Sequence, residues 1–176
     1  MSHITTAVIM AAGLGTRFGQ MTKKLPKGFV PFKGEPMVII LLESDLVFEQ
    51  KAITSLLECH YSDAMLITPV TKFQDQYYVE MDAQCVLTNC STDKTKIKPN
   101  GELVGIHKLS NGFYKKMCAE YERIVDEKPK LGYEYQLLSM SQNVQPMNVL
   151  KVEGLQWYEI DDIDDLKFAE ENIKID

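Results

Sequence analysis

The feature that most constrains the fold is a short apolar run that is followed at once by a glycine-rich loop. Residues 5–10 read TTAVIM, and residues 11–28 read AAGLGTRFGQMTKKLPKG. A β-branched apolar run of this length is typical of a buried strand. Gly13 and Gly15 can adopt positive φ, so the chain can turn sharply there and bring backbone N–H groups together. The sequence therefore predicts a buried strand that ends in a turn lined with amide donors.

Positive charge follows this turn. Consecutive amides in such a turn form a concave anion site, to which Arg17 adds a planar fork and Lys27 a compact charge. We interpret the loop as a cradle for a nucleoside triphosphate; the alternative is a plain tight connection after the strand. The predicted nucleotide-binding residues are Ala11, Ala12, Gly13, Leu14, Gly15, Thr16, Arg17 and Lys27, and Arg17 and Lys27 are also the candidate catalytic residues.

Composition indicates one soluble globular domain over residues 1–176, with 45% hydrophobic and 25% charged residues. The net charge is −6, yet residues 1–40 carry +4 and the remainder −10. A basic patch on an acidic body favours a small polyanion and argues against nucleic acid. No apolar run is long enough to span a membrane, no secretory signal is visible, and the four cysteines form no CxxC pair. We therefore expect a cytoplasmic protein.

Hydrophobic periodicity divides the chain into alternating strands and helices. Predicted strands cover residues 5–10, 38–45, 64–71, 76–81, 85–90, 102–110, 146–152 and 156–160. Predicted helices cover residues 51–58, 110–127, 133–142 and 161–173. Ser110 and Asp162 are the candidate N-caps, and the last helix is expected to bury Ile163, Leu166, Ala169 and Ile173. This order predicts an α/β sheet sandwich with mixed strand directions.

Two aspartates follow apolar strands directly: Asp45 in LLESDLVFE and Asp161 in WYEIDDIDDL. Ligands of open α/β sheets bind at strand ends, and Mg²⁺ prefers carboxylate oxygens, so both are candidate metal ligands. The alternatives are a strand-ending turn for Asp45 and a helix cap for Asp161. Glu43 and Glu159, two residues earlier, share the same strand faces and are candidate supporting groups.

The loop contains neither a Walker A motif nor the GxGxxG fingerprint, because Phe18 stands where the third glycine belongs. Its pattern, AAGLGTRF-x3-T-x3-PKG, resembles the signature of the nucleotidyltransferase superfamily that makes sugar and alcohol nucleotides. LLESDLVFE and WYEIDDIDDLKFAEENI are similar to the two metal-binding segments of that superfamily. TNCSTDKTKI, GELVGIHKLSNGFYKKM and KLGYEYQLL look most like small bacterial cytidylyltransferases acting on phosphocholine or 2-aminoethylphosphonate.

The resemblance implies a Rossmann-like three-layer fold with a mixed, mostly parallel sheet. It also implies transfer of a nucleotidyl group from a nucleoside triphosphate to a small phosphate or phosphonate, with release of pyrophosphate. CMP is the first candidate for the transferred group. Arg17 and Lys27 would hold the triphosphate, while Asp45 and Asp161 would hold Mg²⁺. A sugar phosphate is the alternative acceptor.

A cationic acceptor headgroup needs carboxylates or aromatic faces. Tyr133 and Glu134 in GYEYQ, together with Trp157, are the candidate acceptor-binding residues. Burial in the core is the alternative for the two aromatic residues.

The chain departs from the superfamily pattern at GEPMVIILLESD, where about 30 residues or more, at least one βαβ unit, are missing near residues 38–41. Either the sequence omits a segment of the protein, or the protein is truly shortened. A real deletion would expose a sheet edge and favour a homodimer. The alternative function is then a catalytically impaired nucleotide-binding or assembly protein.

Overall fold

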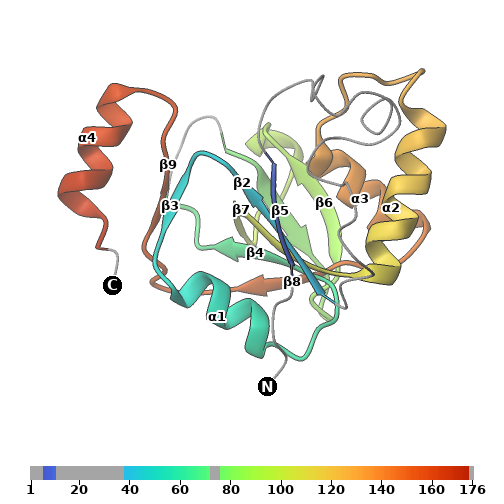
Figure 1. Ribbon diagram of the computed structural model, residues 1–176, viewed down its shortest axis with the longest axis horizontal. Coiled ribbons are helices and arrows are strands. Elements are labelled where there is room, and N and C mark those ends of the chain that lie inside the picture. The colour runs from blue at the N-terminus through green and yellow to red at the C-terminus, as the bar shows by residue number, and fades with distance from the viewer. Residues whose placement is uncertain (1–5, 11–37, 72–75, 175–176) are drawn as a thin grey trace.

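A mixed seven-stranded sheet forms the centre of the protein. The computed structural model describes residues 6–10, 38–71 and 76–174 (Figure 1). The main path of the sheet is β1-β2-β7-β4-β8, and β5 and β6 extend it beside β7. The bounds of these strands are β1 Thr6–Met10, β2 Val38–Glu43, β4 Ala64–Thr68, β5 Tyr78–Met81, β6 Leu87–Ser91, β7 Gly101–Ser110 and β8 Asn148–Lys151. A separate two-stranded ribbon pairs β3, Leu46–Phe48, with β9, Trp157–Glu159.

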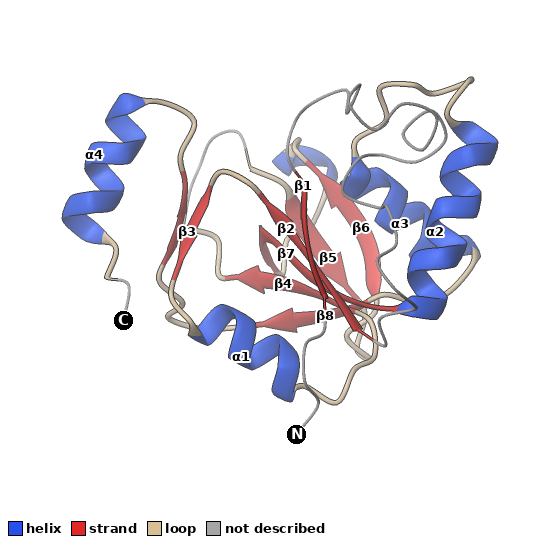
Figure 2. Ribbon diagram, viewed as in Figure 1, coloured by secondary structure: helices blue, strands red, loops and turns tan. Residues whose placement is uncertain are grey.

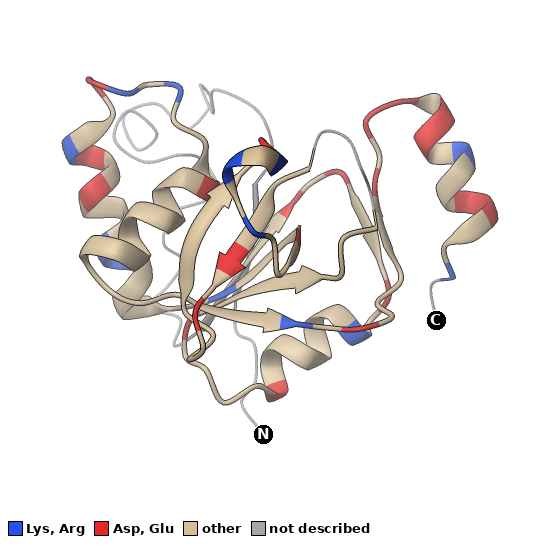
Figure 3. Cartoon of the chain, turned by 180° about the vertical axis from the view of Figure 1, so that it is seen from behind, with Lys and Arg blue, Asp and Glu red and all other residues tan. Residues whose placement is uncertain are grey.

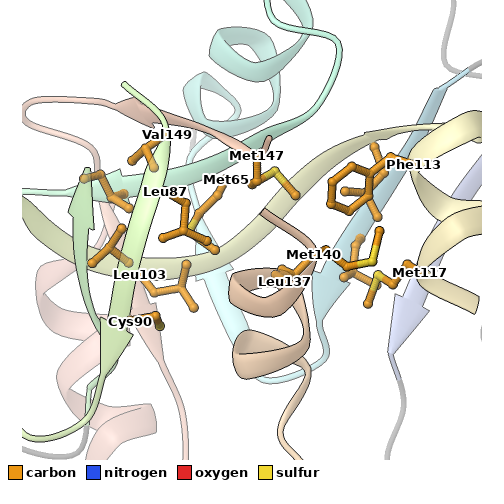
Figure 4. Packing of buried hydrophobic residues seen from close by; sticks show 14 of the residues in the cluster. Met65, Leu87, Cys90, Leu103, Phe113, Met117, Leu137, Met140, Met147 and Val149 are labelled. Carbon is orange, nitrogen blue, oxygen red and sulfur yellow. The ribbon is translucent and has the colours of Figure 1, made fainter. Parts of the chain in front are cut away.

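Helices cover both faces of the sheet, which confirms the expected three-layer α/β fold (Figure 2). Helix α1 (Lys51–Glu58) packs on one face, and α2 (Asn111–Ile124) and α3 (Tyr133–Asn143) pack on the other. Each face has its own apolar core. Figure 4 shows Phe113 and Met117 of α2 beside Leu137 and Met140 of α3 in the larger core. No helix in the described part of the chain is long and apolar enough to cross a membrane.

Strand direction differs from the expectation of a mostly parallel sheet. Of the pairings in the seven-stranded sheet, β1–β2 and β4–β8 are parallel, whereas β2–β7, β4–β7, β5–β7 and β5–β6 are antiparallel. The reason is the position of β7, which lies at the centre and runs opposite to each of its neighbours. Apolar periodicity marks a buried strand but carries no information on its direction.

The predicted N-caps of two helices are confirmed. The Ser110 side chain accepts a hydrogen bond from the backbone N–H of Phe113 at the start of α2. Asp162 caps α4 (Ile163–Asn172) and forms a capping box with Asp165. Caps depend on residues close in the sequence, so the sequence alone identifies them.

The expected buried stripe of α4 is wrong. Ile163 is 71% exposed and Leu166 43%, and only Ala169 of this helix is buried. Figure 1 shows α4 beside the β3–β9 ribbon, away from the sheet. Apolar spacing predicts a helix face but does not ensure that the fold provides a surface to cover it.

Residues 38–41, where the sequence departs from the superfamily pattern, lie within β2 without a break. Strand β1 pairs directly with β2 in parallel, with Thr6 opposite Ile39 and Met10 opposite Glu43. The connection between them, residues 11–37, lies outside the described residues. Strand β1 is the end of the described sheet path on that side.

A pair of leucine truncations tests this division between the core and α4. Leu137→Ala removes a fully buried side chain of α3 and should lower the free energy of unfolding by about 2–5 kcal/mol. Leu166→Ala, on the exposed face of α4, should change it by about 0.5 kcal/mol or less. Urea unfolding followed by circular dichroism measures both. Equal losses would mean that α4 packs against the core.

Candidate active site

The β3–β9 ribbon brings two acidic segments together that lie far apart in the sequence. Leu46 is opposite Glu159, and the backbone N–H of Ile160 donates to the carbonyl of Asp45 at 2.9 Å. Figure 3 shows acidic residues on the chain from β2 to β3 and from β9 to α4. The ribbon therefore places the end of β2 next to the end of β9.

Three carboxylates form a cluster at this junction. Glu43, Asp45 and Glu159 each contribute an oxygen, and these oxygens lie within 4.8 Å of one another. Asp45 is exposed, and the two glutamates are half-buried. Hard oxygen donors at this spacing suit Mg²⁺, which is usually held by one or two carboxylates plus substrate oxygens. We call these three residues the acidic cluster.

Of the two predicted metal ligands, one belongs to the acidic cluster. Asp45 belongs to the acidic cluster, and Glu43 and Glu159, the predicted supporting groups, complete it. Asp161 is exposed, lies two residues beyond Glu159, and is not among the clustered oxygens in the described part of the chain. Its backbone N–H donates to the carboxylate of Asp165 at 3.1 Å.

Burial and mutual repulsion alter the charge of the acidic cluster. The pKa of Glu43 is raised to about 7, chiefly by burial; a hydrogen bond from Tyr133 opposes the rise, and the nearby carboxylates of Glu159, Glu134 and Asp45 add to it. Burial also raises the pKa of Glu134. A group of carboxylates of this kind favours binding of positive charge.

A small cavity of about 90 Å³ adjoins the acidic cluster. It is lined by Glu43, Gln76, Tyr77, Leu103, Glu134, Trp157 and Glu159. Gln76 donates to Glu159 at 2.9 Å, and the Trp157 indole donates to the Thr68 hydroxyl at 3.1 Å. These hydrogen bonds fix the orientation of two side chains that line the cavity. We call this space the headgroup pocket, after the acceptor headgroup that the sequence analysis predicts.

Two of the three predicted acceptor-binding residues line this pocket, and the third, Tyr133, contacts one of its lining residues. Glu134 and Trp157 line it, and the Tyr133 hydroxyl contacts Glu43. The alternative for the aromatic residues also has support, because Trp157 is only 7% exposed and belongs to the core on the α1 side of the sheet. The predicted triphosphate-binding residues, 11–17 and Lys27, lie outside the described residues.

Sequence analysis missed three polar residues near the site: Gln76, Tyr77 and His107. Gln76 and Tyr77 directly precede β5, and nothing in a strand pattern distinguishes a pocket wall from a core residue. His107 is fully buried in β7, and with Lys108 beside it in the sequence, strand patterning gave no signal that it lies near the site.

No family model matches the chain. Among solved structures, the inositol-1-phosphate CTP transferase of T. maritima matches with a TM-score of 0.60 and 16% identity, over 89% of this chain and 60% of that one. CTP:phosphocholine cytidylyltransferase from Streptococcus pneumoniae matches with a TM-score of 0.57 and 14% identity, over 94% of this chain and 97% of that one. The fold is that of the nucleotidyltransferases.

Two sequence relatives that are named as guanyltransferases match a shorter segment of the chain. Mannose-1-phosphate guanyltransferases of Aspergillus oryzae and Emericella nidulans are 30% identical over 77 residues, which is 43% of this chain. The matched segment spans about a fifth (20%) of the length of these curated relatives. The nucleotidyltransferase fold is thus shown over most of the chain, and sequence similarity covers less than half of it.

The raised pKa of Glu43 predicts a pH-dependent effect on stability. A carboxyl group whose pKa rises from 4.5 to about 7 on folding contributes stability that is full below pH 4.5 and is lost as pH rises through 7. Glu43→Gln mimics the protonated form, so in EDTA it should raise the free energy of unfolding by roughly 2 kcal/mol at pH 8 and by much less at pH 5.

Urea titrations at both pH values measure this difference, and Glu127→Gln, at an exposed position, controls for the removal of one charge. A gain that is the same at pH 5 and pH 8 would contradict the assignment.

Proposed function

We propose that the protein is a Mg²⁺-dependent nucleotidyltransferase, with CTP as the first candidate donor and a small phosphate or phosphonate that carries a cationic headgroup as acceptor. The observation that carries this proposal is the acidic cluster beside the headgroup pocket, in a chain with the nucleotidyltransferase fold. Cluster and pocket share Glu43 and Glu159, so a cation and an acceptor would lie next to each other.

The acidic cluster would hold Mg²⁺, with Asp161 retained as the further ligand that the superfamily resemblance implies. When bound, the ion neutralises charge on the triphosphate. Arg17 and Lys27, with the amides of residues 11–17, would hold the triphosphate from the other side. Nucleotidyl transfer places negative charge on the α-phosphate and on the departing pyrophosphate, and fixed positive groups stabilise that charge.

The reaction requires positioning more than proton transfer. An oxygen of the acceptor phosphate forms a bond to the α-phosphorus, and the bond from that phosphorus to the bridging oxygen of pyrophosphate breaks. The acceptor oxygen is already ionised near neutral pH, so no general base is needed. The task of the headgroup pocket is to orient the acceptor, which lowers the entropic part of the barrier.

The size and charge of the pocket favour a cationic headgroup. A cavity of about 90 Å³ has room for roughly three water molecules, which suits an ammonium group better than a sugar ring with its hydroxyls. Glu43, Glu134 and Glu159 supply negative charge, and Tyr77 and Trp157 supply aromatic surface. Carboxylates and aromatic faces together are the usual environment of ammonium ligands.

A sugar 1-phosphate is the second candidate acceptor, and the match to mannose-1-phosphate guanyltransferases favours it. A pyrophosphate-release screen of four nucleoside triphosphates against phosphocholine, 2-aminoethylphosphonate, inositol phosphate and hexose 1-phosphates separates the candidates. The intact mass decides whether the 20.1 kDa chain is the whole protein. Release with no combination, together with a stable dimer of 20.1 kDa chains, would favour the assembly protein instead.

Asp45→Ala tests the acidic cluster. We expect loss of pyrophosphate release by a factor of about 100 or more with an unchanged fold, because the exposed Asp45 carboxylate contributes to charge stabilisation and not to the core. Circular dichroism verifies the fold. Asp126→Ala removes an exposed aspartate outside the site and should keep full activity. Full turnover in Asp45→Ala would remove the metal assignment.

Glu134→Gln tests the headgroup pocket. Removing the charge should raise the KM for phosphocholine about tenfold and leave kcat and the KM for CTP nearly unchanged, since the loss concerns headgroup binding alone. Initial rates at saturating CTP measure this, with Glu122→Gln, an exposed change on α2, as the control. An unchanged KM for phosphocholine would exclude Glu134 from the headgroup pocket.

A further inference from the structure

The proposed reaction assigns no task to His107, a fully buried histidine in β7. Burial lowers the pKa of His107 to about 3, so the ring is neutral at physiological pH. Nε2 lies 3.3 Å from the hydroxyl of Tyr133, which comes from α3. Among the described residues, no group lies within hydrogen-bond distance of Nδ1.

Hydrogen bonding determines which nitrogen of the ring carries the proton. The Tyr133 hydroxyl donates to Oε1 of Glu43, so its proton is used in that bond. The Tyr133 oxygen is then left to accept, and the remaining donor is Nε2–H of His107. Nδ1 consequently has only a lone pair, the less costly group to leave buried without a partner. A chain of hydrogen bonds thus runs from His107 through Tyr133 to Glu43.

Strand β7 also contacts the Glu43 carboxylate directly, at Gly105. In the β2–β7 register Leu41 is opposite His107, and Glu43 follows two residues later on the same face. A Cβ added to Gly105 would lie 2.6 Å from Cδ of Glu43, closer than atoms can approach. Gly105 also has φ +77°, a conformation that other residues rarely adopt. Glycine therefore leaves the space in which the carboxylate lies.

We propose that Gly105, His107 and Tyr133 form a seat that fixes the carboxylate of Glu43 within the acidic cluster before a cation arrives. This inference rests on the proposed function, because it concerns the same cation site. All three act through Glu43 and are positioning residues. Partners that orient a metal-binding carboxylate in this way typically account for 10–100-fold in metal affinity.

The seat counteracts the mutual repulsion of the carboxylates in the acidic cluster. Three carboxylates with oxygens within 4.8 Å repel one another, and a free glutamate side chain would rotate away from the others. A donor that is itself held by a buried neutral ring limits this rotation without bringing a positive charge that would compete with the cation. Edge-to-face packing of His107 on Tyr133, with ring centroids 5.5 Å apart, fixes the donor.

Variants that remove one atom or one donor test the seat. Tyr133→Phe deletes only the hydroxyl, and Tyr121→Phe is the matched control on α2. His107→Leu removes the donor of the ring, whereas the amide of His107→Gln can reach the position of Nε2–H. Mn²⁺ binding to each full-length variant, followed by electron paramagnetic resonance, is the readout, and thermal unfolding verifies the fold.

We expect Tyr133→Phe and His107→Leu to weaken Mn²⁺ binding about tenfold, and His107→Gln and Tyr121→Phe to bind like the unmodified protein. A purely structural role for His107 and Tyr133 would change thermal stability but not ion affinity. The inference is overturned if folded Tyr133→Phe binds Mn²⁺ normally, or if the unmodified protein binds none.

Pyrophosphate release from the same preparations distinguishes this inference from the proposed function. Tenfold weaker Mn²⁺ binding in Tyr133→Phe, combined with no pyrophosphate release from any nucleoside triphosphate by the unmodified protein, would sustain the seat and refute the enzyme. Normal turnover by the unmodified protein, with unchanged Mn²⁺ affinity in Tyr133→Phe, would sustain the enzyme and refute the seat.

Discussion

Strand β7 is the constraint on which the rest of the structure depends. It is buried along nine of its ten residues and pairs with β2, β4 and β5. A strand covered on both faces must be apolar or must supply a partner for each polar group. Glu102 accepts from the backbone of Thr71, Lys108 donates to the carbonyl of Cys59, and His107 bonds to Tyr133. The polar residues of β7 are thereby held in fixed orientations, and one of them lies next to the site.

Local chemistry made much of this fold predictable, and distant contacts did not. The caps Ser110 and Asp162 depend on neighbours within three residues, and the apolar runs depend on their own periodicity, so both could be identified from the sequence. Strand direction and the exposure of Leu166 depend on which elements meet in space. The acidic cluster could be predicted only in part. The position of Asp45 at a strand end indicated it as a metal ligand. The pairing of β3 with β9 places Glu159 beside it, and no rule on sequence spacing predicts that Glu159 comes closer than Asp161.

The acidic cluster is a stability cost that the rest of the fold offsets. Burial of Glu43 beside two other carboxylates disfavours its charged form, which is why its pKa rises to about 7. Two apolar cores on opposite faces of the sheet hold β2 in place despite this repulsion. Sites that store unfavourable electrostatic energy in this way are typical of binding and catalysis, since a ligand of the opposite charge recovers that energy.

Sharing of carboxylates between cluster and pocket limits what the pocket can accept. Glu43 and Glu159 belong to both, Asp45 to the cluster alone, and Glu134 to the pocket alone. When all four are ionised they carry four negative charges, and one divalent cation neutralises only two. A neutral headgroup would then bury the remaining charge without compensation, at a cost of several kcal/mol. Under the proposed function, an ammonium headgroup would reduce that cost directly, so the clustered carboxylates would favour a cationic acceptor beside the metal.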